Sequence, residues 1–157
     1  MRLPKLTALL VTVIFFASCT DSSEIDKDNT YVANALPMTG SQETPAVTTS
    51  ATGSIDANYN KLSKILSYKI TFRGISGTGA TAAHIHGTAD PGVAAGVLQS
   101  FTGFPVLKTS GTYTGTLFID GVKFLEAELL AGRYYMNIHS VANGGGEIRG
   151  QLILTKL

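Results

Sequence analysis

The strongest constraint on the fold is a strict alternation of apolar and polar side chains over residues 66–73. Leu66, Tyr68, Ile70 and Phe72 are apolar, and every residue between them is polar or charged. Successive side chains of a β-strand point to opposite faces of a sheet. The segment therefore predicts a strand that has one face in a core and the other in water.

The same kind of signal recurs between turn-forming residues along the rest of the chain. Clear patterns predict strands over residues 112–119, 134–140 and 147–154, and weaker ones over 31–38, 51–59, 82–86 and 95–101. Only residues 122–131 have helical spacing, and Gly132 is placed to end that helix. About eight strands and one short helix predict a single all-β domain over residues 31–157, an antiparallel Greek-key-like sandwich or barrel.

The last predicted hairpin fixes which side chains share a face. Ile138 must lie opposite Ile148, because a shift of one residue would bury charged side chains. The same register pairs polar residues on the face away from the core: His139 with Glu147, and Asn137 with Arg149.

All three histidines of the chain, His84, His86 and His139, lie on two of the predicted strands. A single residue, Ile85, separates His84 from His86, so both imidazoles share a face of the strand, with their Cα atoms about 6–7 Å apart. If the strand of His139 lies alongside, three ring nitrogens can reach one ion, with Glu147 as a neighbouring carboxylate. Imidazole suits copper, zinc or nickel, so a mononuclear metal site is one hypothesis for these residues.

The alternative is a polar network without a metal. The charge of Arg149 disfavours a bound cation unless Glu147 neutralises it. In this alternative the histidines, with Glu147, Arg149 and Asn137, fix strand register and loop closure. Tyr134 and Tyr135 should lie on opposite faces, one in the core and one over the histidines.

The N-terminal segment is a separate feature. Arg2 and Lys5 accompany an apolar stretch over residues 6–17, which is too short to span a ~30 Å hydrocarbon core but fits a secretory signal peptide of residues 1–18. Cys19 is the only cysteine, so no intrachain disulfide can form. The run Phe16-Ala17-Ser18-Cys19 resembles a bacterial lipobox, which implies cleavage before Cys19 and lipidation of its sulfur. The alternative is an ordinary signal peptide with a cysteine near the cut.

Residues 19–30 are predicted to form a flexible acidic tether, because they contain four acidic residues and a single aliphatic one. Arg2 and Lys5 fall in the removed segment, so the 12 basic residues become 10 against 11 acidic ones. No basic field points to nucleic acid. We expect a protein lipid-anchored through Cys19 in the cell envelope, either periplasmic or at the cell surface.

Five segments in order along the chain resemble the CHRD (chordin) domain family. They are residues 36–45 (LPMTGSQETP), 51–53 (ATG), 83–87 (AHIHG), 130–139 (LAGRYYMNIH) and 145–152 (GGEIRGQL). Small departures are Met38-Thr39-Gly40, where the family more often has Leu-Ser-Gly, and Ser140, where it usually has threonine. Neither departure touches a histidine.

The resemblance implies an all-β extracytoplasmic domain without an established enzymatic activity. We therefore expect a lipid-anchored binding module with no catalytic residue, whose candidate ligands include an extracytoplasmic protein. The alternative function is metal handling or redox chemistry at one copper or zinc ion held by His84, His86 and His139. The His-x-His pair is also similar to copper–zinc superoxide dismutases, but three histidines are too few for their dinuclear site. Glu43 is expected to be a loop anchor that accepts backbone N–H groups.

Overall fold

The computed structural model describes residues 26–157, so the predicted signal peptide and Cys19 lie outside the described residues. The described chain forms two 3₁₀-helices, one α-helix and nine strands. Their bounds are η1 Lys27–Asn29, β1 Thr30–Thr39, η2 Gly40–Gln42, β2 Thr52–Asn60, β3 Ile65–Arg73, β4 Ala80–Gly87, β5 Val97–Ser100, β6 Gly111–Phe118, α1 Glu126–Leu130, β7 Tyr134–Ser140, β8 Ile148–Gln151 and β9 Thr155–Lys156. None of the helices within residues 26–157 is long and apolar enough to cross a membrane.

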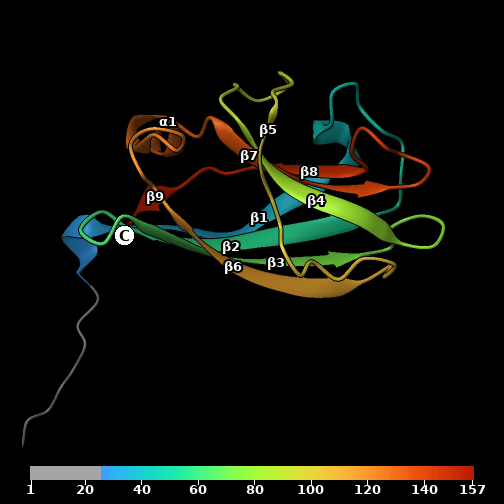
Figure 1. Ribbon diagram of the computed structural model, residues 1–157, viewed down its shortest axis with the longest axis horizontal. Helices are drawn as coiled ribbons and strands as arrows, with labels where there is room; N and C mark the ends of the chain where they lie inside the picture. The colour runs from blue at the N-terminus through green and yellow to red at the C-terminus, as the bar shows by residue number, and fades with distance from the viewer. Residues whose placement is uncertain (1–25) are drawn as a thin grey trace, which may run out of the picture.

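The strands form one antiparallel sheet that folds over on itself. Its order is β5-β4-β7-β8-β1-β2-β3-β6, with β9 paired to β1. The fold-over lies where β8 meets β1, which pair only at Thr39 and Arg149. The strands β5, β4, β7 and β8 thus form one layer above β1, β2, β3 and β6 (Figure 1). The predicted all-β fold is confirmed.

The core lies between the two layers and follows the predicted alternation. The apolar side chains of residues 66–73 are at most 5% exposed. Ile85, Ile138 and Ile148 face them from the other layer and are at most 1% exposed. The predicted register, with Ile138 opposite Ile148 and Asn137 opposite Arg149, is confirmed.

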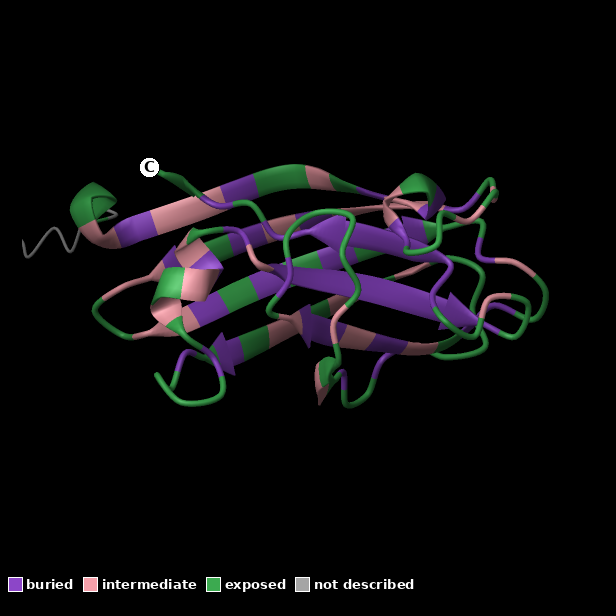
Figure 2. Ribbon diagram, turned by 90° about the horizontal axis from the view of Figure 1, so that it is seen from above, coloured by how far each residue is buried: buried purple, intermediate pink, exposed green. Residues whose placement is uncertain are grey.

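The strands β7 and β8 differ from the others because they are buried along their whole length (Figure 2). Loop residues cover the face that points away from the core. The carbonyls of Val93 and Ala95 reach Arg149 and His86 there, and Gln42 reaches the amide of Gln151. The polar side chains on the face away from the core are therefore held in a buried layer under these loops.

Three of the differences from the sequence-based boundaries have a clear local cause. The helix begins at Glu126 rather than residue 122, because Asp120 Oδ1 accepts the amides of residues 122–124 at 2.8–2.9 Å and holds them in a turn. The fold begins before the predicted end of the tether: Thr30 starts β1, and its hydroxyl donates to the Asp26 carbonyl. The predicted strand 147–154 is split, because the Ile153 amide turns back to the Gln151 carbonyl.

Candidate metal centre

The structure brings the three predicted histidines together. The strands β4 and β7 are neighbours, and His84 lies opposite Asn137. One nitrogen from each of His84, His86 and His139 lies within 4.8 Å of the other two. His84 Nδ1 and His139 Nε2 are 2.8 Å apart. The cluster forms because Ile85 and Ile138 occupy the core face of the same strands, which turns the neighbouring imidazoles outward.

Two of the rings are oriented by backbone carbonyls. His86 Nδ1 lies 2.9 Å from the Ala95 carbonyl oxygen, and His139 Nδ1 lies 3.0 Å from that of Gly144. A carbonyl oxygen can only accept, so both Nδ1 atoms carry the proton and donate it. When a ring with this arrangement is neutral, its Nε2 atom has a lone pair. Metal-binding histidines are held in the same way, by a hydrogen bond from the ring nitrogen that does not bind the metal.

Asn137 lies between these two lone pairs. Its Oδ1 is 3.0 Å from His86 Nε2 and 3.0 Å from His139 Nε2. With both Nδ1 protons committed to carbonyls, His86 Nε2 and Asn137 Oδ1 face each other as acceptors, whereas His139 Nε2 can also accept from His84 Nδ1 at 2.8 Å. Either a cation among them or a turn of the Asn137 amide, which would place its Nδ2 donors there, satisfies these acceptors. The first solution is a metal site and the second is the polar network.

The electrostatic environment favours the neutral form of His84 and His139. Burial lowers the pKa of His84, and the neighbouring histidines lower it further. Burial also lowers the pKa of His139, against the raising effect of its hydrogen bond to Gly144. Neutral imidazole is the metal-binding form, so these two rings need lose no proton before they bind an ion.

The Tyr135 ring separates Arg149 from the histidines. It stacks on His86 with 4.7 Å between ring centroids, and the Arg149 guanidinium carbon lies 3.4 Å from the Tyr135 centroid. Arg149 also donates to the Val93 carbonyl and to Gln151 Oε1. Because β7 lies between β4 and β8, the Tyr135 ring stands between the Arg149 guanidinium and the His86 ring. The expected division of the tyrosines is found: Tyr134 packs in the core against Phe124.

Glu147 does not join the histidines, which corrects the expectation of a neighbouring carboxylate. Its backbone amide donates to the Ile138 carbonyl at 2.7 Å, just before β8 begins, and its side chain turns toward other loops. Oε1 accepts from the Thr49 hydroxyl and Oε2 from the Ser76 hydroxyl, at 2.7 and 2.8 Å. Burial raises its pKa, but the hydrogen bonds from Ser140, Thr49 and Ser76 outweigh that and lower it.

Glu43 is the buried carboxyl nearest Asn137, and the sequence patterns did not place it here. Its side chain is 8% exposed, and Oε1 has no hydrogen-bond partner. Burial raises the pKa of Glu43 to about 7, against the lowering effects of the Arg149 charge and hydrogen bonds from Asn137 and the Thr44 amide. Gly146 leaves room for the Glu43 carboxyl beside Asn137. A β-carbon on Gly146 would overlap Glu43 Oε1 and crowd Asn137 Nδ2.

The fold and this geometry define an all-β module with a histidine cluster on the outer side of one layer. The family model described as CHRD domain matches residues 35–152, so the chain belongs to the CHRD domain family. No curated protein and no solved structure matches it significantly.

Proposed function

We propose that this chain is a lipid-anchored binding module of the cell envelope that holds one copper or zinc ion through His84, His86 and His139. The observation that carries the metal is the convergence of one nitrogen from each of the three histidines within 4.8 Å, with the Asn137 oxygen 3.0 Å from two of these rings.

The donor set and spacing favour a transition metal. Zinc–nitrogen bonds are about 2.0–2.1 Å, so two nitrogens on one ion lie at most about 4 Å apart. The histidine nitrogens now lie within 4.8 Å of one another. The most widely separated pair must therefore approach by about 1 Å to share one ion. His84 is partly exposed, which leaves a route for the ion from solvent. Copper has the highest intrinsic affinity for such a set among the divalent first-row metals, and zinc also binds imidazole well.

Binding, rather than catalysis, is the role that these side chains support. The carboxylate of Glu147 accepts hydrogen bonds from Thr49 and Ser76, so it is not placed to act as a base at the histidines. The anchor rests on the sequence alone, on the basic and apolar segment that leads to Cys19. Lipid attachment through two or three acyl chains would hold the domain firmly on a bilayer.

A titration of the chelator-treated mature protein with copper and zinc, one metal at a time, tests the metal site. We expect one bound ion per chain, and we expect His84→Ala to weaken binding at least about tenfold because one of three ligands is lost. Asn58→Ala, on a strand of the other layer, is the control and should bind as the wild type does. Equal affinity of His84→Ala and wild type would contradict the site. In the polar-network alternative, His139→Ala lowers the free energy of unfolding by about 1–3 kcal/mol with no change in metal binding.

A further inference from the structure

The end of the fold where the described chain begins carries an exposed apolar patch. We call it the proximal end. The Lys61 amide donates to the Asn29 carbonyl, and the Leu157 amide donates to the Thr30 carbonyl. The turn between β2 and β3 and the C-terminus therefore lie beside the start of β1. The Ile119 amide donates to the Lys64 carbonyl, which brings the residues after β6 to the same end.

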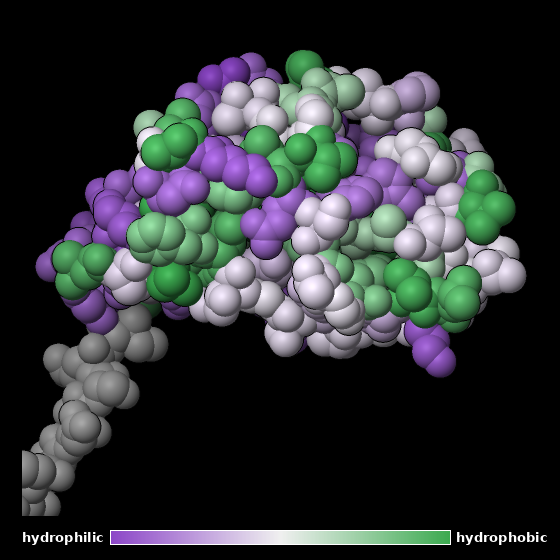
Figure 3. Space-filling model, viewed as in Figure 1, coloured by the Kyte–Doolittle hydropathy of each residue, from purple (hydrophilic) through white to green (hydrophobic). Residues whose placement is uncertain are grey.

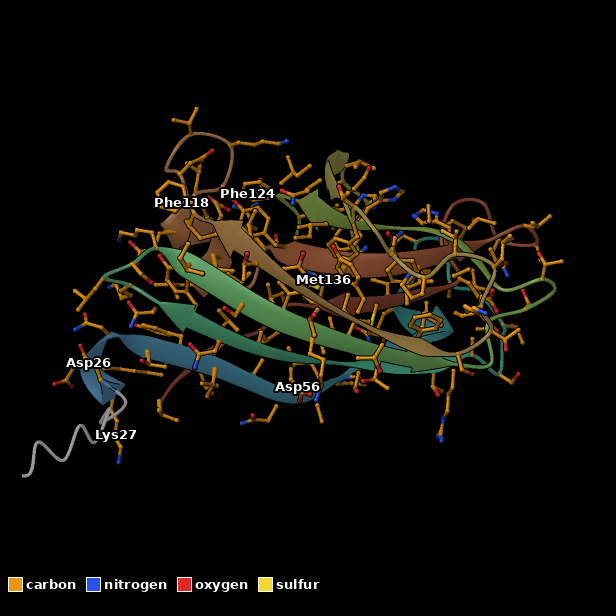
Figure 4. The ribbon with its side chains drawn as sticks, turned by 60° about the horizontal axis from the view of Figure 1, so that its bottom comes forward. Asp26, Lys27, Asp56, Phe118, Phe124 and Met136 are labelled. Carbon is orange, nitrogen blue, oxygen red and sulfur yellow. The ribbon has the colours of Figure 1, made fainter. Side chains whose placement is uncertain are left out.

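Four large apolar side chains are exposed at this proximal end. They are Leu62, Phe118, Val122 and Leu157, which are 71%, 57%, 86% and 47% exposed. Figure 3 shows hydrophobic side chains interleaved with hydrophilic ones at this end of the molecule, and Figure 4 places Phe118 at the same end as Asp26 and Lys27. Exposed apolar side chains that gather at one end of a domain mark a contact surface.

The position of Cys19 indicates that this surface contacts a lipid bilayer. This step rests on the proposed lipid anchor. Seven residue steps separate Cys19 from Asp26, and an extended chain of that length spans at most about 25 Å. An acylated Cys19 lies in the bilayer surface, so the proximal end cannot move farther than that from the lipid.

The charges of the proximal end nearly balance. The basic residues there are Lys27, Lys61, Lys64, Lys123 and Lys156, and the acidic ones are Asp26, Asp28, Asp120 and Glu126. Two of these lysines are paired, Lys64 with Glu126 and Lys156 with Asp28. Apolar contact, rather than attraction to anionic headgroups, must therefore supply the docking energy, and long lysine side chains can extend to the headgroup level.

We infer that Leu62, Phe118, Val122 and Leu157 dock the domain end-on against the bilayer that holds Cys19. The docking orients the histidine cluster. Thr30 lies at the proximal end of β1, and Thr39, at its other end, pairs with Arg149 beside the site. Ten residues of strand span about 30 Å. The histidine cluster then lies on the side of the domain, well away from the membrane surface and open to metal from solution.

Hydrogen exchange on the acylated mature protein tests this orientation. The protein is placed on phosphatidylcholine vesicles, and Cys19→Ser in buffer is the reference. The amides of residues 61–64 and 119–124 lie in surface turns and should exchange severalfold more slowly on vesicles. The double variant Leu62→Ser, Val122→Ser should lose this protection. The control Val93→Ser, Val141→Ser changes two side chains that are also exposed, 53% and 77%, but lie away from the proximal end, and should keep it.

The outcomes separate the docking from the anchor. Protection that is unchanged when phosphatidylglycerol is added supports apolar docking, whereas protection that appears only with phosphatidylglycerol overturns it. A mass spectrum that shows acylated Cys19, together with unprotected turns, overturns the docking and leaves the anchor intact. An unmodified Cys19 in that spectrum overturns the anchor and the docking that depends on it.

Discussion

Gly146 shows how single residues determine the space around the histidines. Its φ of 133° is one that L side chains rarely adopt, and a β-carbon there would overlap Glu43 Oε1. Gly144 supplies the carbonyl that orients His139, two residues earlier in the same loop. The path of this loop thus sets both the His139 tautomer and the position of the Glu43 carboxyl.

Gly146→Ala is expected to lower the free energy of unfolding by about 1–3 kcal/mol, because of the strained backbone and the overlap with Glu43. It should also weaken metal binding, since the loop cannot keep the Gly144 carbonyl in place. The matched control is Gly145→Ala, where a β-carbon meets nothing within 4 Å, and its effect should stay within about 0.5 kcal/mol. Denaturant unfolding measures both. Equal stabilities of the two variants would show that Gly146 is replaceable.

Glu43 makes stability depend on pH with a definite sign. Its pKa is raised from 4.5 to about 7, so the folded state binds the proton more tightly than the unfolded state. The stabilisation is complete below about pH 4.5 and is lost as the pH rises toward 7, by at most about 3 kcal/mol. Glu43→Gln stays neutral and escapes this loss. The stability of Glu43→Gln minus that of the wild type should therefore grow between pH 4.5 and 7.

The lowered pKa values of His84 and His139 act in the opposite direction, since acid charges them in the unfolded state first. This effect is present in both proteins and cancels in the difference. A difference that is flat over this pH range would show that Glu43 is ionised without cost.

At the scale of elements, β7 and β8 form a polar layer that is buried under loops. A strand that alternates toward water on one face ordinarily exposes its polar residues. Here residues 88–96 and 142–146 provide backbone carbonyls, so the polar side chains are satisfied by loops rather than by solvent. Glu147 adds to these contacts between the strands and the loops. Its carboxylate accepts hydrogen bonds from the loops of Thr49 and Ser76, and so connects both loops to the turn that precedes β8.

Glu147→Ala should lower the free energy of unfolding by about 1–3 kcal/mol, because it leaves the partly buried donors of Thr49 and Ser76 without an acceptor. Thr49→Val removes one of these hydrogen bonds and should cost about 1 kcal/mol. Metal affinity should be unchanged in both variants, since Glu147 faces away from the histidines. A large loss of metal affinity in Glu147→Ala would place this carboxylate in the metal site after all.

At the scale of the whole molecule, the sheet holds the site at its fold-over. The histidine strands and Arg149 belong to one layer, and Glu43 follows β1 of the other layer. Unfolding must therefore separate the groups around the ion. A metal at one hundred times its dissociation constant should raise the free energy of unfolding by about 2.7 kcal/mol. Thermal unfolding with and without zinc measures this, and His84→Ala should show a much smaller rise. An equal rise in both would mean that the metal binds elsewhere.

The sequence alone determined the strands, the core faces and the hairpin register. Alternation in residues 66–73 and the pairing of Ile138 with Ile148 depend on burial, which a local pattern of apolar residues records directly. The grouping of His84, His86 and His139 followed once β4 and β7 became neighbours. Only the tertiary structure decided which loop groups surround the histidines. The turn of Glu147 away from the histidines, the arrival of Glu43 and the carbonyls of Ala95 and Gly144 all depend on loop paths. Loop paths are set by contacts between residues far apart in the chain, and no local periodicity encodes them.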